Sequence, residues 1–391
     1  MHSQITSKAI GGALLGALLL LLLPLTGLAA AEKPSFLAGK VSDLSGTGLS
    51  LEKKAAAAGT EFRKTGGAKT YFTAYEFMSR HKIHRGNTDR FPGAYVVNTK
   101  ESRIRIEEKS RGKNRVETEI EDTPAPAALL FLHDQAKNGE VLDVTVLDTD
   151  QTYDFVDAPV FWLGRADNAE SVSFLERSFE AAKDREQAQK NLLFAAACHQ
   201  GAPAYVFLKR AALGPSGDKV RETAIFWLGN YGDSQSLTDL KEIYGKEKSV
   251  SVKKQIIFAM QLSKQKEAVE ELIRIAKQDA SPEARKQAVF WLGQKASAES
   301  VKALKDIVEA PSDEDSLKEQ AVFAISQLPK DRSVPMLVDI ARSNKSPSVR
   351  KRAIFWLGQS GDPAALKFFE EILLKELLGS RLHSTEKKWK L

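Results

Sequence analysis

The chain has 391 residues, 42% of them hydrophobic, which is enough for two or three folded parts with sizeable cores. The formal net charge of +6 is small for this length, and acidic and basic residues are interspersed, so the sequence lacks the concentrated basic face of a nucleic-acid-binding protein. Cys198 is the single cysteine, which excludes an intramolecular disulfide and leaves stability to packing.

Residues 1–31 have the layout of a secretory signal peptide. Lys8 precedes an apolar run from about Ala13 to Leu25, and small residues at 29–31 follow. A retained membrane anchor is the alternative interpretation, for which the run is short. The absence of a cysteine after the run disfavours a lipid anchor attached to cysteine. We expect cleavage after Ala31, export to the periplasm or the medium, no stable membrane insertion afterwards and no nucleic-acid partner.

Residues 32–68 are rich in Gly, Ser, Ala and Lys, which predicts a linker or loosely ordered arm with one short helix near residues 51–58. Residues 69–154 contain β-branched and aromatic runs with partial alternation, such as "TYFTAYEFMS" and "AALLFLHD". These runs predict a small antiparallel β domain of about five or six strands. Because the end of a helical stack must be covered, this domain is expected to cap the part that follows.

Residues 155–376 repeat with a step of 32 or 33 residues. Copies of Phe-Trp-Leu-Gly alternate with weaker relatives, and the aligned phenylalanines are Phe161, Phe194, Phe226, Phe258, Phe290, Phe323 and Phe355. Each unit has one apolar helical stripe, a Gly-containing break and a second stripe. Because such a unit cannot bury its apolar face alone, we expect about seven units stacked into a right-handed α-solenoid. Residues 377–391 are expected to form a C-terminal cap and a basic tail.

The units "VRKRAIFWLGQSGDPAALKFFEEIL" and "VRETAIFWLGNYGDSQSLTDLKEIY" resemble HEAT repeats, of the short kind also found in phycobilisome lyases. The shared pattern is Val-Arg, Ala, Leu-Gly, Gly-Asp and a later Leu with Ile. The resemblance covers roughly residues 155–376. It implies the fold and says little about activity, because this scaffold serves many roles.

The residue after each aligned phenylalanine alternates between large and small. The column is Trp162, Ala195, Trp227, Ala259, Trp291, Ala324 and Trp356, and a glycine follows two residues after every Trp. We favour large-against-small packing between neighbouring units, with the glycine allowing close approach of the backbones. The alternative is an aromatic ladder that lines a groove and stacks on sugars, bases or a proline-rich peptide.

Two charged columns run along the repeats. A basic column near the start of each first helix contains Arg221, Lys253, Arg285, Lys318 and Arg350. Because HEAT-like repeats have such a row, we favour a structural role, with partners such as Asp233 or Asp362, over an anion-binding strip.

The second charged column lies on the second helices. It comprises Arg177, Arg210, Glu242, Arg274, Asp306, Asp339 and Glu371, basic towards the N-terminus and acidic towards the C-terminus. We expect it on the inner, concave side of the solenoid, where it would complement a partner protein with opposite patches. A solvated face is the alternative.

Candidate catalytic residues are scarce. Surface exposure explains His81, His84 and His133 better than a metal site does. Cys198 and His199 are adjacent, and adjacent side chains on a helix point about 100° apart, which disfavours a nucleophile–base pair. We therefore expect no catalytic site, no metal and no cofactor.

The leading hypothesis is an exported, non-enzymatic and monomeric scaffold that binds a protein partner through the concave face of the solenoid. One alternative is an enzyme of the chromophore-lyase type, which the resemblance suggests and export disfavours. The other is a carbohydrate- or peptide-binding protein that uses the Trp series.

Overall fold

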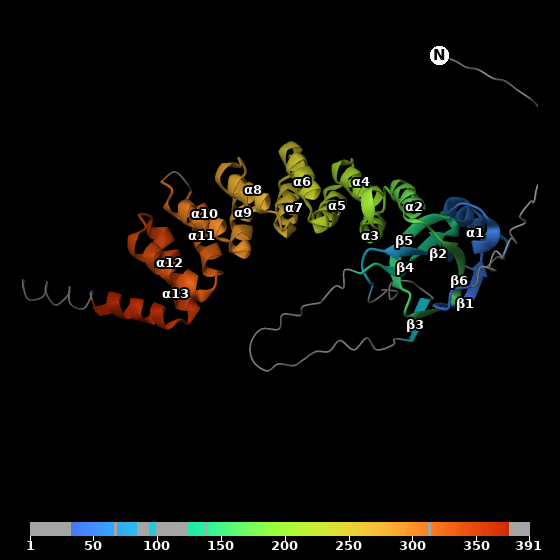
Figure 1. Ribbon diagram of the computed structural model, residues 1–391, viewed down its shortest axis with the longest axis horizontal. Helices are drawn as coiled ribbons and strands as arrows, with labels where there is room; N and C mark the ends of the chain where they lie inside the picture. Colours follow the sequence, from blue (N-terminus) through green and yellow to red (C-terminus); the bar gives the residue numbers. More distant parts are fainter. Residues whose placement is uncertain are drawn as a thin grey trace, which may run out of the picture.

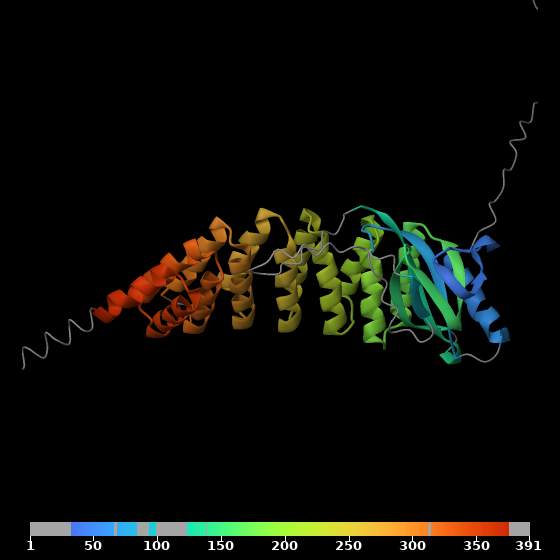
Figure 2. The same ribbon diagram turned by 90° about the horizontal axis from the view of Figure 1, so that it is seen from below.

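The computed structural model describes residues 33–65, 69–83, 94–98, 123–137, 139–311 and 314–374. A β-sheet stands at one end, and an arc of helices extends from it (Figures 1 and 2). The expected signal peptide, the strand runs expected between 99 and 122 and the tail at 377–391 lie outside the described residues. None of the described helices combines the length and the apolar content that crossing a bilayer requires.

The described part of the chain contains one six-stranded sheet. Its strands are β1 (Leu37–Asp43), β2 (Thr70–Ser79), β3 (Ala94–Asn98), β4 (Ala125–Asp134), β5 (Glu140–Asp148) and β6 (Thr152–Arg165). Their order is β1-β6-β2-β4-β5, and β3 also pairs with β6. β4 is antiparallel to β2 and β5, whereas β6 is parallel to β1 and β2.

The sheet is therefore mixed, and the wholly antiparallel arrangement expected from the sequence is wrong. The reason lies in residues 32–68, which the composition assigned to a linker. They supply an edge strand, β1, and a full helix, α1 (Leu51–Thr65), that crosses back to β2. Such a crossover sets the two strands it joins in the same direction, and β6 enters between them.

The predicted solenoid of two-helix units is confirmed. Its helices are α2 (Asn168–Ala181), α3 (Glu186–Ala197), α4 (Gly201–Leu213), α5 (Asp218–Tyr231), α6 (Ser234–Lys246), α7 (Val250–Leu262), α8 (Lys266–Gln278), α9 (Pro282–Lys295), α10 (Ala298–Glu309), α11 (Asp315–Ser326), α12 (Lys330–Ser343) and α13 (Pro347–Ser360). Residues 363–374 are also helical. Each unit begins with an odd-numbered helix. Ser281 and Ser346 cap α9 and α13, and a proline follows each in the first turn.

The first Phe-Trp-Leu-Gly copy lies on strand β6 and not on a helix. Phe161 and Trp162 therefore face opposite sides of the sheet. Phe161 joins the core shared with the solenoid, while Trp162 packs edge-on against Phe36 at 5.6 Å on the other side. The first expected unit thus consists of a strand and α2, and the domain boundary expected at residue 155 falls inside β6. Pro159, two residues before Phe161, is incompatible with the interior of a helix.

The odd-numbered helices from α3 to α13 form the inner side of the arc, and the even-numbered helices form its outer side (Figure 1). Two of the glycines that accompany a Trp, Gly229 and Gly293, explain this arrangement. A Cβ added to Gly229 of α5 would lie 2.7 Å from the Cβ of Ala259 on α7. One added to Gly293 of α9 would lie 2.9 Å from the Cβ of Ala324 on α11. Because the first helices approach so closely, their side of the stack is the shorter one, and the solenoid curves towards it.

A single hydrophobic core joins the sheet to the arc. It runs from Phe77 and Phe131 on one face of the sheet, through Leu240 and Leu304 of the solenoid, to Phe368 in the last described helix. The backbone also connects the two parts, because the Arg80 N–H at the end of β2 donates to the Cys198 carbonyl at the end of α3, 2.7 Å away. The sheet therefore covers the first helices of the stack.

Adding a methyl group at the inner crossings should destabilise the protein. We expect Gly229→Ala and Gly293→Ala each to cost about 1–3 kcal/mol, because the new Cβ meets the backbone as well as the side chain of the facing alanine. Gly358→Ala is the matched control: nothing lies within 4 Å of that position, and Ala is about 0.5–1 kcal/mol better than Gly inside a helix. Thermal unfolding followed by circular dichroism measures the change in stability of each variant. Stabilisation by Gly293→Ala would contradict the close approach of α9 and α11.

Candidate functional site

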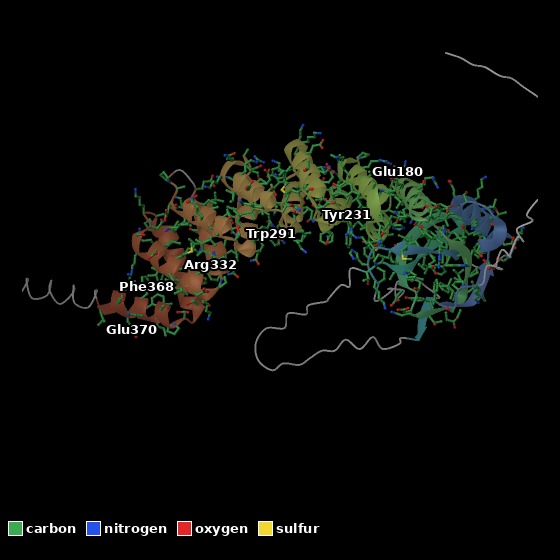
Figure 3. The ribbon with its side chains drawn as sticks, viewed as in Figure 1. Glu180, Tyr231, Trp291, Arg332, Phe368 and Glu370 are labelled. Atoms are coloured by element: carbon green, nitrogen blue, oxygen red, sulfur yellow. The ribbon has the colours of Figure 1, made fainter. Side chains whose placement is uncertain are left out.

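The charged column that was expected on the concave face lies on the outer helices, so that prediction is wrong. The column is Arg177, Arg210, Glu242, Arg274, Asp306, Asp339 and Glu371, on even-numbered helices and on residues 363–374. The small residues that permit close approach belong to the first helix of each unit, which leaves the second helices outside. Figure 3 shows Glu180 of α2 at the outer edge of the arc and Trp291 of α9 at the inner edge.

Most members of this outer column form ion pairs with neighbouring elements. The pairs are Arg177–Glu52, Arg210–Glu176, Glu242–Lys209, Asp306–Lys277 and Glu371–Arg342, with N···O separations of 2.5–3.7 Å. Arg274 pairs with Glu271 on its own helix. These exposed pairs are worth about 0–1 kcal/mol each, and they neutralise the charges that a partner protein was expected to meet.

The basic column holds the loops at the ends of the outer helices. Its contacts are Arg221 with Glu247, Lys253 with Asp279, Arg285 with Glu314, and Arg350 with the Asn344 carbonyl. These contacts fit the structural role predicted for the column, but the two acids suggested as partners, Asp233 and Asp362, do not pair with it. Asp233 caps α6 and Asp362 accepts from the Ala364 N–H. Lys318 makes none of these contacts.

A continuous row of aromatic rings follows the inner helices, and we call it the aromatic stripe. Its members in spatial order are Phe194, Trp227, Phe226, Phe258, Trp291, Phe290, Phe323, Trp356 and Phe355, with neighbouring ring centroids 4.8–6.3 Å apart. Phe194 is 37% exposed and Phe355 50%, and the seven rings between them are half-buried. Each indole of the stripe packs on the phenylalanine of the preceding unit, whereas the small residues Ala259 and Ala324 lie against Gly229 and Gly293. The row still reaches solvent, as the ladder interpretation required.

The stacking within the aromatic stripe determines what it presents to solvent. Phe226 lies parallel to Phe258, with an angle of 8° between ring planes, and Phe290 lies parallel to Phe323, with an angle of 11°. With their centroids 6.0 and 6.3 Å apart, these parallel rings are offset from each other. Ring edges carry partial positive charge and favour contact with electron-rich atoms such as carbonyl oxygens.

A row of amides runs beside the aromatic stripe. Gln255, Gln287 and Gln320 each precede the phenylalanine of their helix by three residues, which places them on the same helix face. Their side chains are half-buried and make no hydrogen bond within the described part of the chain. A hollow of about 370 Å³ lies here, lined by Lys254, Glu283, Lys286, Gln287, Phe290 and Gln320. The inner side thus offers apolar edges next to free donors and acceptors.

Two of the described histidines, His133 and His199, are buried, and both ring nitrogens of each are hydrogen-bonded. His133 hydrogen-bonds Thr73 Oγ1 at 2.8 Å and the Gly139 carbonyl at 2.9 Å. His199 hydrogen-bonds Ser171 Oγ at 2.6 Å and the Ala195 carbonyl at 2.8 Å. Burial lowers the pKa of both imidazoles to about 4.

His199 belongs to a buried polar chain that the sequence did not reveal. The Tyr75 hydroxyl lies 2.8 Å from Ser171 Oγ, which also contacts His199, and Phe77 stacks on the imidazole at 4.2 Å. The chain links β2, α2 and the loop after α3. It therefore aligns the sheet with the solenoid.

The other residues considered for catalysis or metal binding are no better suited to that role. Burial raises the pKa of the Cys198 thiol to about 12, so the nucleophilic thiolate is not formed at neutral pH. His84 lies outside the described residues. In the part of the chain that the structure describes, no cluster of three or more His, Cys, Asp or Glu could hold a metal ion.

Stacked helix pairs on one continuous core define an α-solenoid repeat protein. Residues 239–326 and 309–381 match the family model of HEAT repeats, and residues 220–245 match that of the PBS lyase HEAT-like repeat. The repeats of this chain are HEAT repeats, as their sequence resemblance implied.

Similar solved structures include human deoxyhypusine hydroxylase in complex with glycerol, which is 20% identical, with 52% of this chain and 77% of that chain covered and a TM-score of 0.24. The YIBA protein of Escherichia coli is 19% identical, with 53% and 76% covered and a TM-score of 0.33. Both likenesses are too weak to bear on function. No curated protein matches the chain.

The buried histidines make stability depend on pH. Each is neutral in the folded protein down to a pKa of about 4 but takes up a proton near 6.5 when unfolded, so the unfolded state binds more protons between these values. We expect stability to fall as the pH drops through this window, by about 1.4 kcal/mol per pH unit for each histidine. His133→Gln should remove about half of the slope between pH 6.5 and 5 in chemical denaturation. An unchanged slope would contradict a neutral His133 in the fold.

Proposed function

We propose that this protein is an exported, non-enzymatic scaffold that binds an extended segment of a partner protein along the inner side of its HEAT-repeat arc. The aromatic stripe carries this proposal. Nine contiguous rings, none of them fully buried, form an apolar row on one face. Large contiguous apolar surfaces that stay accessible mark interaction sites in soluble proteins.

The partner segment that best fits the stripe is a polyproline-II helix. Packed helices lie about 8–10 Å apart, and a polyproline-II chain advances about 9.3 Å every three residues. Every third residue of the segment would therefore meet an equivalent point on successive inner helices. A β-strand repeats its side-chain direction about every 6.6 Å, which does not match the spacing of the inner helices.

The amide row supports a polypeptide ligand. A polyproline-II chain has no internal hydrogen bonds, so its carbonyls are available to a partner. Gln255, Gln287 and Gln320 recur once per inner helix and have free amides that can donate to those carbonyls. Lys254, Lys286 and Glu283 border the same hollow, and their net charge of +1 favours a segment that carries acidic residues.

Two other functions are less well supported. Sugar binding by the Trp series needs open ring faces, but each indole of the stripe is half-buried and packs on the phenylalanine of the preceding unit at 5.0–5.2 Å. A chromophore-lyase activity is less well supported because the described His133, His199 and Cys198, which could act as base or nucleophile, are buried. The export part of this proposal is supported only by the residue pattern of 1–31.

Site-directed crosslinking in the native compartment tests the binding face. We expect a photoreactive amino acid at Gln287 to capture one dominant protein, and the same probe at Lys302 on the outer side of α10 to capture none. Phe258→Ser together with Phe290→Ser should reduce the Gln287 product at least tenfold, while Arg210→Glu on the outer side should leave it unchanged. Capture from Lys302 alone would place the site on the outer side and contradict the proposal.

A direct titration tests the chemistry of the ligand. A proline-rich acidic peptide of about 12 residues spans the four steps from α5 to α13. We expect it to bind and to change the tryptophan fluorescence, with the affinity reduced by Trp291→Ala. A soluble oligosaccharide of equal length is the control. Binding of the oligosaccharide and not the peptide would overturn the polypeptide assignment in favour of sugar.

A further inference from the structure

Lys318 is the one member of the basic column without a partner among the described residues. It begins the second turn of α11, is only 8% exposed, and makes no hydrogen bond or ion pair. Its Nζ is not sealed from solvent, so an anion can reach it, and a largely desolvated ammonium group favours a counter-ion. The other units show which anion the fold provides.

In two other units a carboxylate stands 26 residues after the base. Glu247 pairs with Arg221, and Asp279 pairs with Lys253. Each of these acids also shapes its loop: Glu247 accepts from the Ser249 N–H at 2.7 Å, and Asp279 accepts from the Ser281 N–H at 2.8 Å. One side chain thus performs a structural and an electrostatic role.

The position 26 residues after Lys318 carries Asn344 in place of an acid. Its side-chain oxygen accepts from the Ser346 N–H at 3.0 Å, so the structural role is retained. Its amide group donates to the Val308 carbonyl at 3.0 Å. Because an amide is neutral, this position supplies no negative charge to Lys318.

A cavity of about 590 Å³ occupies the place where that charge is missing, between the ends of α10 and α12. Lys318 lines it together with Asn344, Ser343 and Ser346 on the polar side. Val308, Met336 and Ile340 form an apolar wall. This volume lies in the range of small-molecule sites, about 300–1,000 Å³.

Two acids also line the cavity. Glu309 lies 3.9 Å from Lys305, another lining residue, and Asp339 is exposed. Asp315, in the turn before Lys318, accepts from the hydroxyls of Ser346 and Ser348 at 2.8 and 3.0 Å; these bonds, and to a lesser degree the charge of Lys318, lower the pKa of Asp315. Lys345 is the third lysine of the lining, and three lysines against two acids leave a net charge of +1.

We propose that this cavity binds a carboxylate that carries an apolar group. The carboxylate would take the position that Glu247 and Asp279 hold in their units and pair with Lys318, and the apolar group would pack on Val308, Met336 and Ile340. A small carboxylic acid and the C-terminal residue of a polypeptide share this chemistry. The site lies at the loops of the outer helices and is independent of the aromatic stripe.

Calorimetric titration of the full chain tests the site. The ligands are N-acetyl-leucine, which resembles a C-terminal residue, octanoate as a small acid, and N-acetyl-leucinamide as the neutral control. We expect at least one acid to bind with a Kd below about 1 mM, a free energy of about −4 kcal/mol, and the amide at least tenfold more weakly. Tighter binding of N-acetyl-leucine favours a polypeptide terminus as the source, and tighter binding of octanoate favours a small acid.

Two variants make the result specific. Lys318→Met removes the charge at similar length and should abolish the preference for acid over amide. Asn344→Asp supplies the missing carboxylate, so it should block the acid and raise the melting temperature of the unliganded protein. Failure of both acids to bind, or wild-type affinity in Asn344→Asp, overturns the proposal.

Discussion

The contact between a glycine on one inner helix and an alanine on the next determines most of this structure. Gly229 against Ala259 and Gly293 against Ala324 leave no room for a further carbon atom, so the first helices of these units pack with their backbones in near contact. Close packing on one side and wider spacing on the other produce the arc. At these same two crossings the neighbouring Phe rings lie parallel, with centroids 6.0 and 6.3 Å apart, so the close packing also aligns part of the aromatic stripe.

The sheet completes the stack by taking the place of a missing helix. Strand β6 carries the first copy of the repeated tetrapeptide, and α2 follows it as the outer helix of a unit without an inner helix. The buried chain from Tyr75 through Ser171 to His199 then sets the angle between sheet and solenoid. Buried polar groups of this kind are unfavourable unless every member is bonded, which makes them specific for one arrangement.

Much of the solenoid could be predicted because its period, helix breaks and caps are local properties of the chain. The start of the solenoid could not be predicted, because strand β6 contains the same tetrapeptide as the helical units. Only Pro159 distinguishes the sequence of this strand from that of a helix. The direction of curvature was missed because it depends on which helices touch, and a helical pattern does not state this. The Trp column was recognised as a candidate site, but its continuity arises from Phe258 and Phe323 in the units without Trp. The unpaired Lys318 was visible in principle, by comparing the residues that follow each base at a fixed distance.

The central claim is that the inner side of the arc is an open surface that a partner covers. Acrylamide quenching of tryptophan fluorescence tests it directly when single-Trp proteins that retain Trp291 or Trp162 are compared, each with and without the partner captured from Gln287. Trp291 is half-buried on the aromatic stripe, whereas Trp162 is 5% exposed in the sheet. The account predicts that Trp291 is quenched in the free protein and protected in the complex, while Trp162 is shielded in both. A Trp291 that is equally quenched with and without the partner would contradict the assignment of the binding face.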